Sequence, residues 1–244
     1  MDFLGFVVIG FAAQVIDGAL GMAYGVTSTT FLLAMGIPPA PASAAVHTAE
    51  VFTTGVSGVS HLRLGNVDNE LFRRLVVPGI CGGVVGAYVL TAVPGQTIKP
   101  FVAVYLLAMG VFILVKSFRR APETTVRTKL IRLGLAGGFL DAVGGGGWGP
   151  IVTSTLVARG NSPRLTIGSI NLAEFFVTVA QSAVFLALLG LTNWRISAGL
   201  MVGGVIAAPF AAYLCRRLPS RTLMGMVGVL LIVLSTRTIY LALR

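Results

Sequence analysis

The chain has 244 residues, of which 55% are hydrophobic and only 11% are charged, whereas a soluble domain carries roughly 25% charged residues. So few charges cannot cover the surface of a water-soluble protein, and the composition indicates an integral membrane protein surrounded by lipid. The net charge of +10 does not indicate nucleic-acid binding, because the basic residues lie in short loops between apolar runs. No metal-ligand spacing, disulfide framework or GxxxxGK nucleotide motif is present, so we expect no cofactor and no metal.

Apolar runs long enough to cross a bilayer, which takes about 20 residues, occur at 39–60, 71–93, 98–115, 165–189, 196–214 and 223–243. Two further apolar regions, 2–36 and 130–160, are too long for one span and too short for two. Glycines and a carboxylate interrupt each of them, with Asp17 in the first and Asp141 in the second. We predict that each region is a hairpin of two short helices that meet inside the membrane.

The basic residues test this topology, because cytoplasmic loops of membrane proteins carry an excess of Lys and Arg. If both regions are hairpins, one face carries 14 basic residues and the other carries three, whereas two single spans give 11 against six. The hairpin topology is therefore favoured. Its basic face holds Arg63, Arg73, Arg74, Lys116, Arg119, Arg120, Arg127, Lys129, Arg132, Arg159, Arg164, Arg216, Arg217 and Arg221, and its opposite face holds Lys99, Arg195 and Arg244.

The two halves of the chain share a residue pattern at an offset of 124 positions. Apolar residues would match by chance, but Asp, Glu, Pro and Tyr would not match in register. The chain is therefore predicted to contain two copies of one unit. The matched pairs include Asp17 with Asp141, Gly25 with Gly149, Thr29 with Thr153, Pro39 with Pro163, Glu50 with Glu174, Thr54 with Thr178 and, after one inserted residue, Tyr88 with Tyr213.

Each copy contains one hairpin and three full crossings, so the second copy is expected to be inverted in the membrane. Inverted repeats with helices broken at the midplane are the architecture of secondary transporters. The predicted fold class is an all-α polytopic membrane protein with two inverted repeats, each a broken-helix hairpin plus three transmembrane helices. Residues 1–120 would form the first repeat, 121–128 a cytoplasmic linker and 129–244 the second repeat.

Four of the eight acidic residues lie within apolar regions, namely Asp17, Glu50, Asp141 and Glu174. An ionisable group inside the membrane costs at least about 2.5 kcal/mol on insertion scales, which makes it a functional candidate. A hydrogen-bonded carboxyl that only joins helices is the alternative interpretation. Because the four form two repeat-related pairs, we favour them as candidates for proton coupling.

Polar residues follow one face of each helix that carries a glutamate, at steps of three and four residues. These residues are His47, Glu50, Thr54 and Ser57 in the first copy and Asn171, Glu174, Thr178 and Gln181 in the second. A polar seam between helices would show the same pattern. We favour a stripe that lines a central cavity, with His47, Asn171 and Gln181 as substrate-binding residues and His47 as a partner for Glu50.

The two interruptions are rich in glycine and in hydroxyl side chains. Glycines before a helix N-terminus let backbone N–H groups converge on an anion, although glycines also permit close helix packing. Four successive glycines at 144–147 exceed what packing requires. The predicted substrate-binding residues are Gly21, Gly25, Thr29 and Thr30 in the first copy and Gly146, Gly147, Trp148, Gly149, Thr153 and Ser154 in the second.

The Asp17-Gly18 break, the Gly-Gly-Trp-Gly-Pro run at 146–150, the repeat and the basic central loop together resemble the TauE/SafE sulfite-exporter family. The similarity covers nearly the whole chain. The resemblance implies a multi-pass transporter of small sulfur-containing anions, such as sulfite or organosulfonates, in the bacterial cytoplasmic (inner) membrane. It does not identify the anion, and it leaves a homo-oligomer open.

Two other functions fit parts of the pattern, namely an anion channel and an intramembrane enzyme that uses the buried carboxylates. Catalytic sites are seldom duplicated, whereas transport sites lie between repeats, so we expect a carrier and no enzyme. A monovalent anion leaving a cell whose interior is about 150 mV negative gains roughly 3.5 kcal/mol, so membrane potential can drive export. Ionised Glu50 and Glu174 would repel the anion. We therefore expect both to be protonated or paired when it binds, which would link transport to protons.

The topology makes a prediction about access from the outside of the cell. In a protein whose Cys81 and Cys215 are replaced by serine, Arg217→Cys should resist a membrane-impermeant thiol reagent added to intact cells. The same reagent should label Arg195→Cys, which lies on the opposite face. Labelling of the Arg217→Cys protein from outside would contradict the hairpin topology.

Overall fold

Helices make up all the regular structure in the part of the chain that the computed structural model describes, which is residues 3–20, 22–118, 129–153, 155–156, 159, 161–190, 194–215 and 220–242. In this part the all-α class is confirmed, and the predicted linker at 121–128 lies outside it. The elements are α1 (Phe3–Leu20), α2 (Tyr24–Ala34), α3 (Pro39–Arg63), α4 (Asn69–Ala92), α5 (Gly95–Ser117), α6 (Leu130–Gly144), η1 (Trp148–Thr153), α8 (Pro163–Leu189), α9 (Trp194–Cys215) and α10 (Ser220–Ala242).

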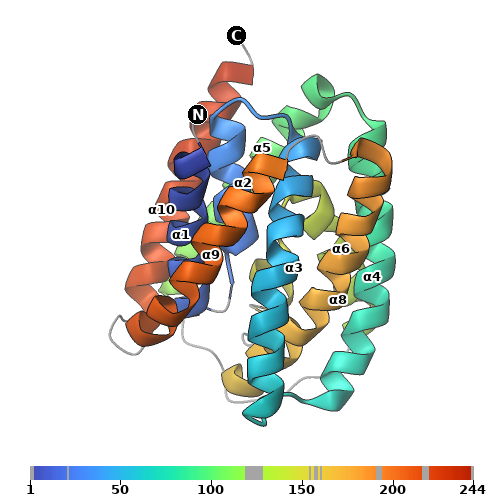
Figure 1. Cartoon of the computed structure of the whole chain (residues 1–244), viewed down its shortest axis with the longest axis vertical. Helices are drawn as coiled ribbons and strands as arrows, with labels where there is room; N and C mark the ends of the chain where they lie inside the picture. The colour runs from blue at the N-terminus through green and yellow to red at the C-terminus, as the bar shows by residue number, and fades with distance from the viewer. Residues whose placement is uncertain are drawn as a thin grey trace.

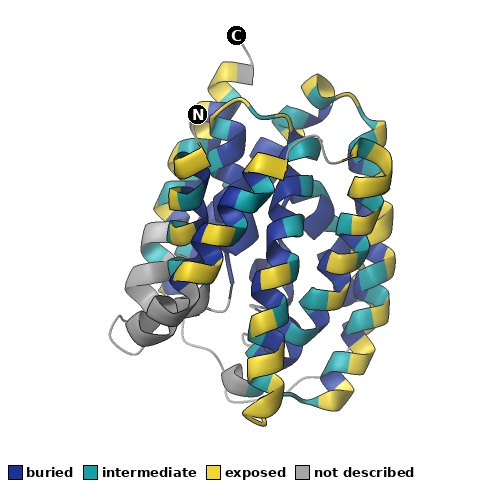
Figure 2. Cartoon of the chain, viewed as in Figure 1, coloured by how far each residue is buried: buried dark blue, intermediate teal, exposed yellow. Residues whose placement is uncertain are grey.

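The surface of the bundle is that of a membrane protein. Within the described ranges, three helices are long and apolar enough to cross a bilayer by length and composition, at Asn69–Ala92, Gly95–Ser117 and Leu165–Leu189. Large apolar side chains also stand exposed along the helices (Figure 2), among them Phe101 with 71% of its surface accessible. Exposed apolar area on this scale is compatible with lipid and not with water.

Both interrupted regions double back on themselves. The α1 helix starts at the end of the bundle where α2 finishes, and the turn between them lies inside the bundle (Figure 1). In the second region, η1 folds back onto α6, because Val152 packs against Gly137. At the second break, where we predicted a helix N-terminus after the glycines, Trp148–Thr153 form a π-helical turn.

The central pair of long helices, α3 and α8, runs antiparallel (Figure 1). Gly55 packs against Phe175 and Gly58 against Leu172, so residue numbers rise on one helix as they fall on the other. These two helices carry the two polar stripes, and their contact brings the stripes together in the middle of the bundle.

Close helix contacts occur in pairs that match the repeat. Gly10 of α1 lies against the backbone of Leu200 in α9, and Gly134 of α6 lies against the carbonyl of Leu75 in α4. The two glycines are 124 positions apart and the two leucines 125, which are the offsets of the repeat. Each half therefore places its first helix against the fourth helix of the other half.

The two breaks cross each other at the centre of the molecule. Gly25 packs against Gly146, and Gly149 packs against Met22, with no room for a side chain on any of these glycines. Gly25 with Gly149 and Met22 with Gly146 are again 124 positions apart. An exchange of the halves maps each contact onto the other, as the predicted repeat requires. The inversion of the repeat in the membrane stays a prediction.

The close packing of α4 on α6 predicts a stability effect. A Cβ atom at Gly138 would collide with the carbonyl oxygen of Gly79, so Gly138→Ala should destabilise the protein by about 2 kcal/mol, as overpacking does. Gly225→Ala on α10 is the control, because open space surrounds that position and alanine favours helix. Thermal unfolding in detergent should show a lower midpoint for Gly138→Ala only. Equal midpoints would contradict the close contact.

Candidate functional site

The four acidic residues of the apolar regions come together around the crossing of the breaks, although they are far apart in the sequence. Asp17 from the end of α1, Glu50 from α3 and Glu174 from α8 line one small cavity. Glu50 lies beside Gly25 at the crossing. Asp141, near the end of α6, contacts side chains of α3 and α8. The arrangement has two parts, a hydrogen-bonded carboxylate at Asp141 and an acidic cavity beside it.

Asp141 accepts four hydrogen bonds and is only 1% exposed. Its Oδ1 atom accepts from the backbone N–H groups of Gly147 at 2.7 Å and Trp148 at 2.9 Å. Its Oδ2 atom accepts from Gln181 Nε2 at 3.0 Å and lies 3.1 Å from His47 Nε2. A carboxylate has about four sites for hydrogen bonds, so Asp141 is fully satisfied. This is how a charge can be kept in an apolar bundle.

A proton lies between His47 and Asp141. The Nδ1 atom of His47 is 2.7 Å from the carbonyl oxygen of Ser43, which can only accept, so Nδ1 carries a hydrogen. The Nε2 atom faces Asp141 Oδ2, which is an acceptor when the carboxyl is ionised. This contact therefore holds one more proton, either on the imidazole ring or on the carboxyl. The prediction that His47 pairs with Glu50 is wrong, because the nearer carboxylate belongs to α6 and not to the same helix.

The donors that we predicted for a substrate anion are used within the protein. Gly147, Trp148, His47 and Gln181 were all expected to bind the substrate, and in the structure all four bind Asp141. These donors thus surround a carboxyl group of the chain itself, and binding of a substrate there stays a prediction. We call this donor set the Asp141 cradle.

Two threonines near the breaks use their hydroxyl groups to hydrogen-bond backbone carbonyls. Thr29 donates from its hydroxyl to the carbonyl of Gly145, which ties the first break to the second. Thr30 donates to the carbonyl of Val26 at 2.6 Å, within its own helix. The hydroxyl of Thr153 is buried and has no hydrogen-bond partner among the described residues.

The glycines at the crossing serve close approach of the two backbones. Gly25, Gly146 and Gly149 all lie in the contact between the breaks. Gly146 also has a φ of +140°, a backbone conformation that glycine adopts readily and other residues do not. The predicted site residues Gly21 and Ser154 lie outside the described residues.

The acidic cavity is small and has an unsatisfied carboxylate oxygen. Its volume is about 10 Å³, which is room for about one water molecule. Glu50 is 3% exposed, and its Oε2 atom has no hydrogen-bond partner in the part of the chain that is described. Asp17 accepts from the backbone N–H of Tyr24 at 3.2 Å. Because none of the described residues that line the cavity is Lys or Arg, it suits a proton or a cation and would repel an anion.

The surroundings of Asp141 and of its repeat counterpart Asp17 differ, which the repeat does not predict. The counterparts of His47 and Gln181 in the repeat are Asn171 and Ser57. Ser57 donates to the Oδ1 atom of Asn171 at 3.1 Å, so these two side chains bond to each other. The cradle is therefore built around Asp141 in the second half, and the side chains that could build it around Asp17 are paired elsewhere.

Sequence reasoning missed three residues of the site. Ser43 lies 3.2 Å from His47 Nδ1 and donates its hydroxyl to the carbonyl of Ala142 at 2.6 Å. It stands one helical turn before His47 on the same face, which could have revealed it. Tyr24 is the repeat counterpart of Trp148 and could have been found from that pairing.

The third missed residue, Tyr105 of α5, gave no signal in the sequence. Its hydroxyl donates to the carbonyl of Gly146 at 3.3 Å, and its ring fills the space where Gly144 and Gly147 have no side chain. It is a tyrosine in an otherwise apolar helix. The packing of α5 on the second break is a tertiary contact that no local pattern indicates.

Ser43, His47 and Asp141 lie in the order of a serine-hydrolase triad, but the hydrogen bonds differ from those of a nucleophile. In a triad the histidine accepts the proton of the serine hydroxyl. Here the hydroxyl of Ser43 donates to a backbone carbonyl, and the facing nitrogen of His47 donates to another. Ser43 is also fully buried. The three residues form a fixed polar network and show no activated hydroxyl.

The cradle predicts unequal effects of two equivalent substitutions. Asp141→Asn replaces an acceptor by an NH₂ group and leaves buried donors unpaired, which should cost about 3–5 kcal/mol of stability. Asp17→Asn, at the equivalent position of the first half, should cost only about 1 kcal/mol because it disturbs one backbone hydrogen bond. Thermal unfolding of both variants in detergent measures the difference. Similar losses in both would show that Asp141 has no special structural role.

Comparison with known proteins agrees with this architecture. The sequence model of the family described as "Sulfite exporter TauE/SafE" matches residues 6–238. The chain is 45% identical to "Probable membrane transporter protein YtnM" of Bacillus subtilis (strain 168) over an aligned length of 244 residues, which covers 96% of this chain and 81% of the relative. No solved structure matches the chain. With a match over nearly its whole length, the chain belongs to the TauE/SafE family and is a membrane transporter of that type.

Proposed function

We propose that the protein is a carrier, and not an enzyme, that exports a small sulfur-containing anion across the bacterial cytoplasmic membrane. Sulfite is the substrate that the family description names, and organosulfonates are the related substrate class that the resemblance implies. The observation that carries the proposal is the Asp141 cradle. Four donors converge there on one anion, and none of them comes from Lys or Arg. A substrate held only by neutral donors and one histidine can be released again, as transport requires.

The cradle suits an oxyanion because a sulfite or sulfonate group, like a carboxylate, presents several oxygen acceptors on one atom. When the shared proton moves from His47 to Asp141, the carboxyl becomes neutral. Its hydrogen bonds then weaken, because bonds to a charged acceptor are worth about 1.5–3 kcal/mol and neutral ones about 0.5–1.5. The backbone N–H groups of Gly147 and Trp148 are then free to donate to a substrate oxygen. Asp141 thus competes with the substrate for the same donors.

The acidic cavity can store the protons that accompany the exchange of Asp141 for the substrate at the donors. Glu50, Glu174 and Asp17 line a space with no basic side chain, so their ionised forms repel one another and repel an anion nearby. Uptake of a proton by these carboxyls removes that repulsion while the substrate is in the cradle. Proton binding and anion binding would then favour each other, which is the coupling that a proton-linked carrier needs.

Membrane potential supplies the driving force in this proposal. A monovalent anion gains roughly 3.5 kcal/mol on leaving a cell whose interior is about 150 mV negative, and a dianion gains twice as much. Alternating access would follow from the inverted repeat, for which the paired contacts of the two halves give support. The contacts of Gly25 with Gly146 and of Met22 with Gly149 support an exchange point between the two halves.

The direct test is sulfite efflux from vesicles that contain the purified protein. Efflux should saturate with sulfite concentration and accelerate when the interior is made negative, and a separate pH gradient should change its rate. Sulfite should be recovered unchanged outside the vesicles. Flux that rises linearly without saturation would indicate a channel. Sulfite consumed without appearing outside would indicate an enzyme.

Proton storage in the acidic cavity predicts the behaviour of one variant. Glu174→Gln mimics the protonated side chain permanently, so it should keep sulfite binding and lose most of the pH dependence of efflux. Glu70→Gln is the matched control, because Glu70 lies at the start of α4 beside Arg74 and outside the cavity, and its pH profile should equal that of the wild type. Loss of sulfite binding in a well-folded Glu174→Gln protein would show that the ionised form is needed.

A further inference from the structure

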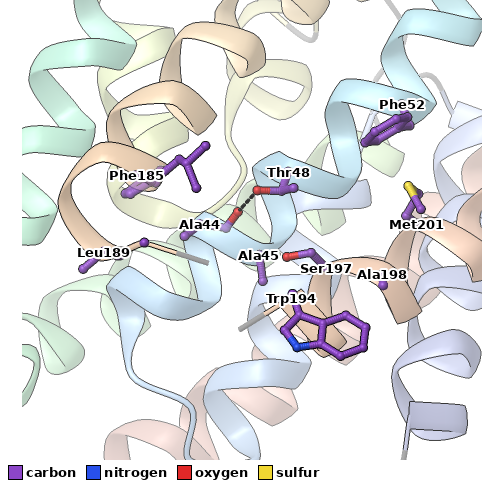
Figure 3. Close-up of a pocket in the computed structure, with 12 residues that line it drawn as sticks. Ala44, Ala45, Thr48, Phe52, Phe185, Leu189, Trp194, Ser197, Ala198 and Met201 are labelled. Carbon is purple, nitrogen blue, oxygen red and sulfur yellow. Dashed lines mark hydrogen bonds between the residues drawn. The ribbon is translucent and has the colours of Figure 1, made fainter. Parts of the chain in front are cut away.

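A groove of about 240 Å³ opens on the side of the bundle between α3, α8 and α9 (Figure 3). Its wall is largely apolar, with Phe52 from α3, Phe185 from α8 and Met201 from α9 among the lining residues. The hydroxyl of Thr48 does not offer its hydrogen to the groove, because it donates to the carbonyl of Ala44 within α3. An apolar groove of this kind is unsuited to a small anion and suited to a hydrocarbon chain.

Among the described residues, the position that corresponds to this groove in the repeat is occupied by side chains. In the repeat, Ser197 of α9 corresponds to Phe72 of α4, and Phe52 of α3 corresponds to Phe176 of α8. At the equivalent place the rings of Phe72 and Phe176 pack together, with centroids 5.8 Å apart, and fill the space. The small side chain of Ser197 is therefore what leaves the groove open beside Phe52.

The mouth of the groove lies at the ends of two helices. Leu189 ends α8 and Trp194 begins α9, so the mouth lies at the membrane surface and the groove reaches about 10 Å down α9 to Met201. Trp194 is 60% exposed, as aromatic residues at a membrane interface are.

The charge at this mouth is positive. Arg195 is exposed, and its guanidinium lies 6.0 Å from the centre of the Trp194 ring. The N-terminal end of α9 adds partial positive charge at the same place. An apolar slot below a positive mouth matches the shape and charge of one membrane lipid.

We propose that this groove binds one acyl chain of an anionic phospholipid, with the lipid phosphate at Arg195 and the start of α9. The inner wall of the groove is Phe185, whose ring centroid is 5.8 Å from that of His47. Phe185 therefore contacts both the groove and His47 of the Asp141 cradle. The lipid is therefore a structural partner of the transport site, and the position that corresponds to it in the repeat is filled by Phe72 and Phe176.

Native mass spectrometry of the detergent-purified full chain, incubated with phosphatidylglycerol, tests the groove. The wild type should retain one phospholipid, and Ser197→Phe, which copies the residue of the other half, should lose it. Ala198→Leu fills the groove from a neighbouring position and should lose it too. Val205→Phe is the matched control, because Val205 is exposed on α9 and is not part of the groove wall, and it should retain the lipid.

The mouth is tested with phosphatidylcholine as the competing lipid. The wild type should prefer phosphatidylglycerol, and Arg195→Gln should abolish that preference. Three results would overturn the proposal. The wild type could retain no lipid, Ser197→Phe and Ala198→Leu could retain as much lipid as the wild type, or Val205→Phe could lose as much lipid as the groove variants. Retention of the lipid by Ser197→Phe together with loss of sulfite flux would assign the groove to the anion pathway instead. Lipid retention is measured without transport, so failure of the proposed export function would leave this result unaffected.

Discussion

A carboxylate inside an apolar bundle must have every oxygen site hydrogen-bonded, and in this protein that requirement organises the centre of the molecule. Asp141 accepts from the backbone of the second break, from His47 on α3 and from Gln181 on α8. Loss of any of these donors leaves a buried charge partly unpaired, which is costly. The positions of three separate segments are thus set by one side chain, and the crossing of the two breaks lies next to it.

The same requirement explains why the site has two chemically different parts. Donors gather around Asp141, whereas Asp17, Glu50 and Glu174 share a small cavity with an unsatisfied Glu50 oxygen. The Asp141 cradle can hold negative charge, and the acidic cavity can hold protons. His47 contacts Asp141 and can pass a proton to it. Membership of the TauE/SafE family gives the molecule its transporter class, and the separation of these two parts is the feature that an anion carrier linked to protons would use.

Much of the fold could be predicted from local pattern. The apolar runs, the two interrupted regions and the pairing of Asp17 with Asp141 follow from composition and spacing, and the all-helical class is confirmed. Prediction failed where partners had to be chosen. The pairing of His47 with Glu50 was wrong, and Tyr105 was not found, because spacing along one helix shows which residues share a face and does not show which other helix that face meets. Close approach of the glycines, which was the alternative interpretation, does occur, and the N–H group of Gly147 binds Asp141.

The sequence by itself determined that this chain is a polytopic membrane protein with duplicated breaks and buried carboxylates, because lipid solvation and helix interruption depend on residues that are near one another in the chain. Only the tertiary structure decided which carboxylate is satisfied and which is left beside an acidic cavity. His47 and Gln181 are 94 and 40 positions from Asp141, and the equivalent Asn171 and Ser57 bond to each other instead. Hydrogen bonds act over about 3 Å, so their partners are settled by how helices distant in the sequence pack together.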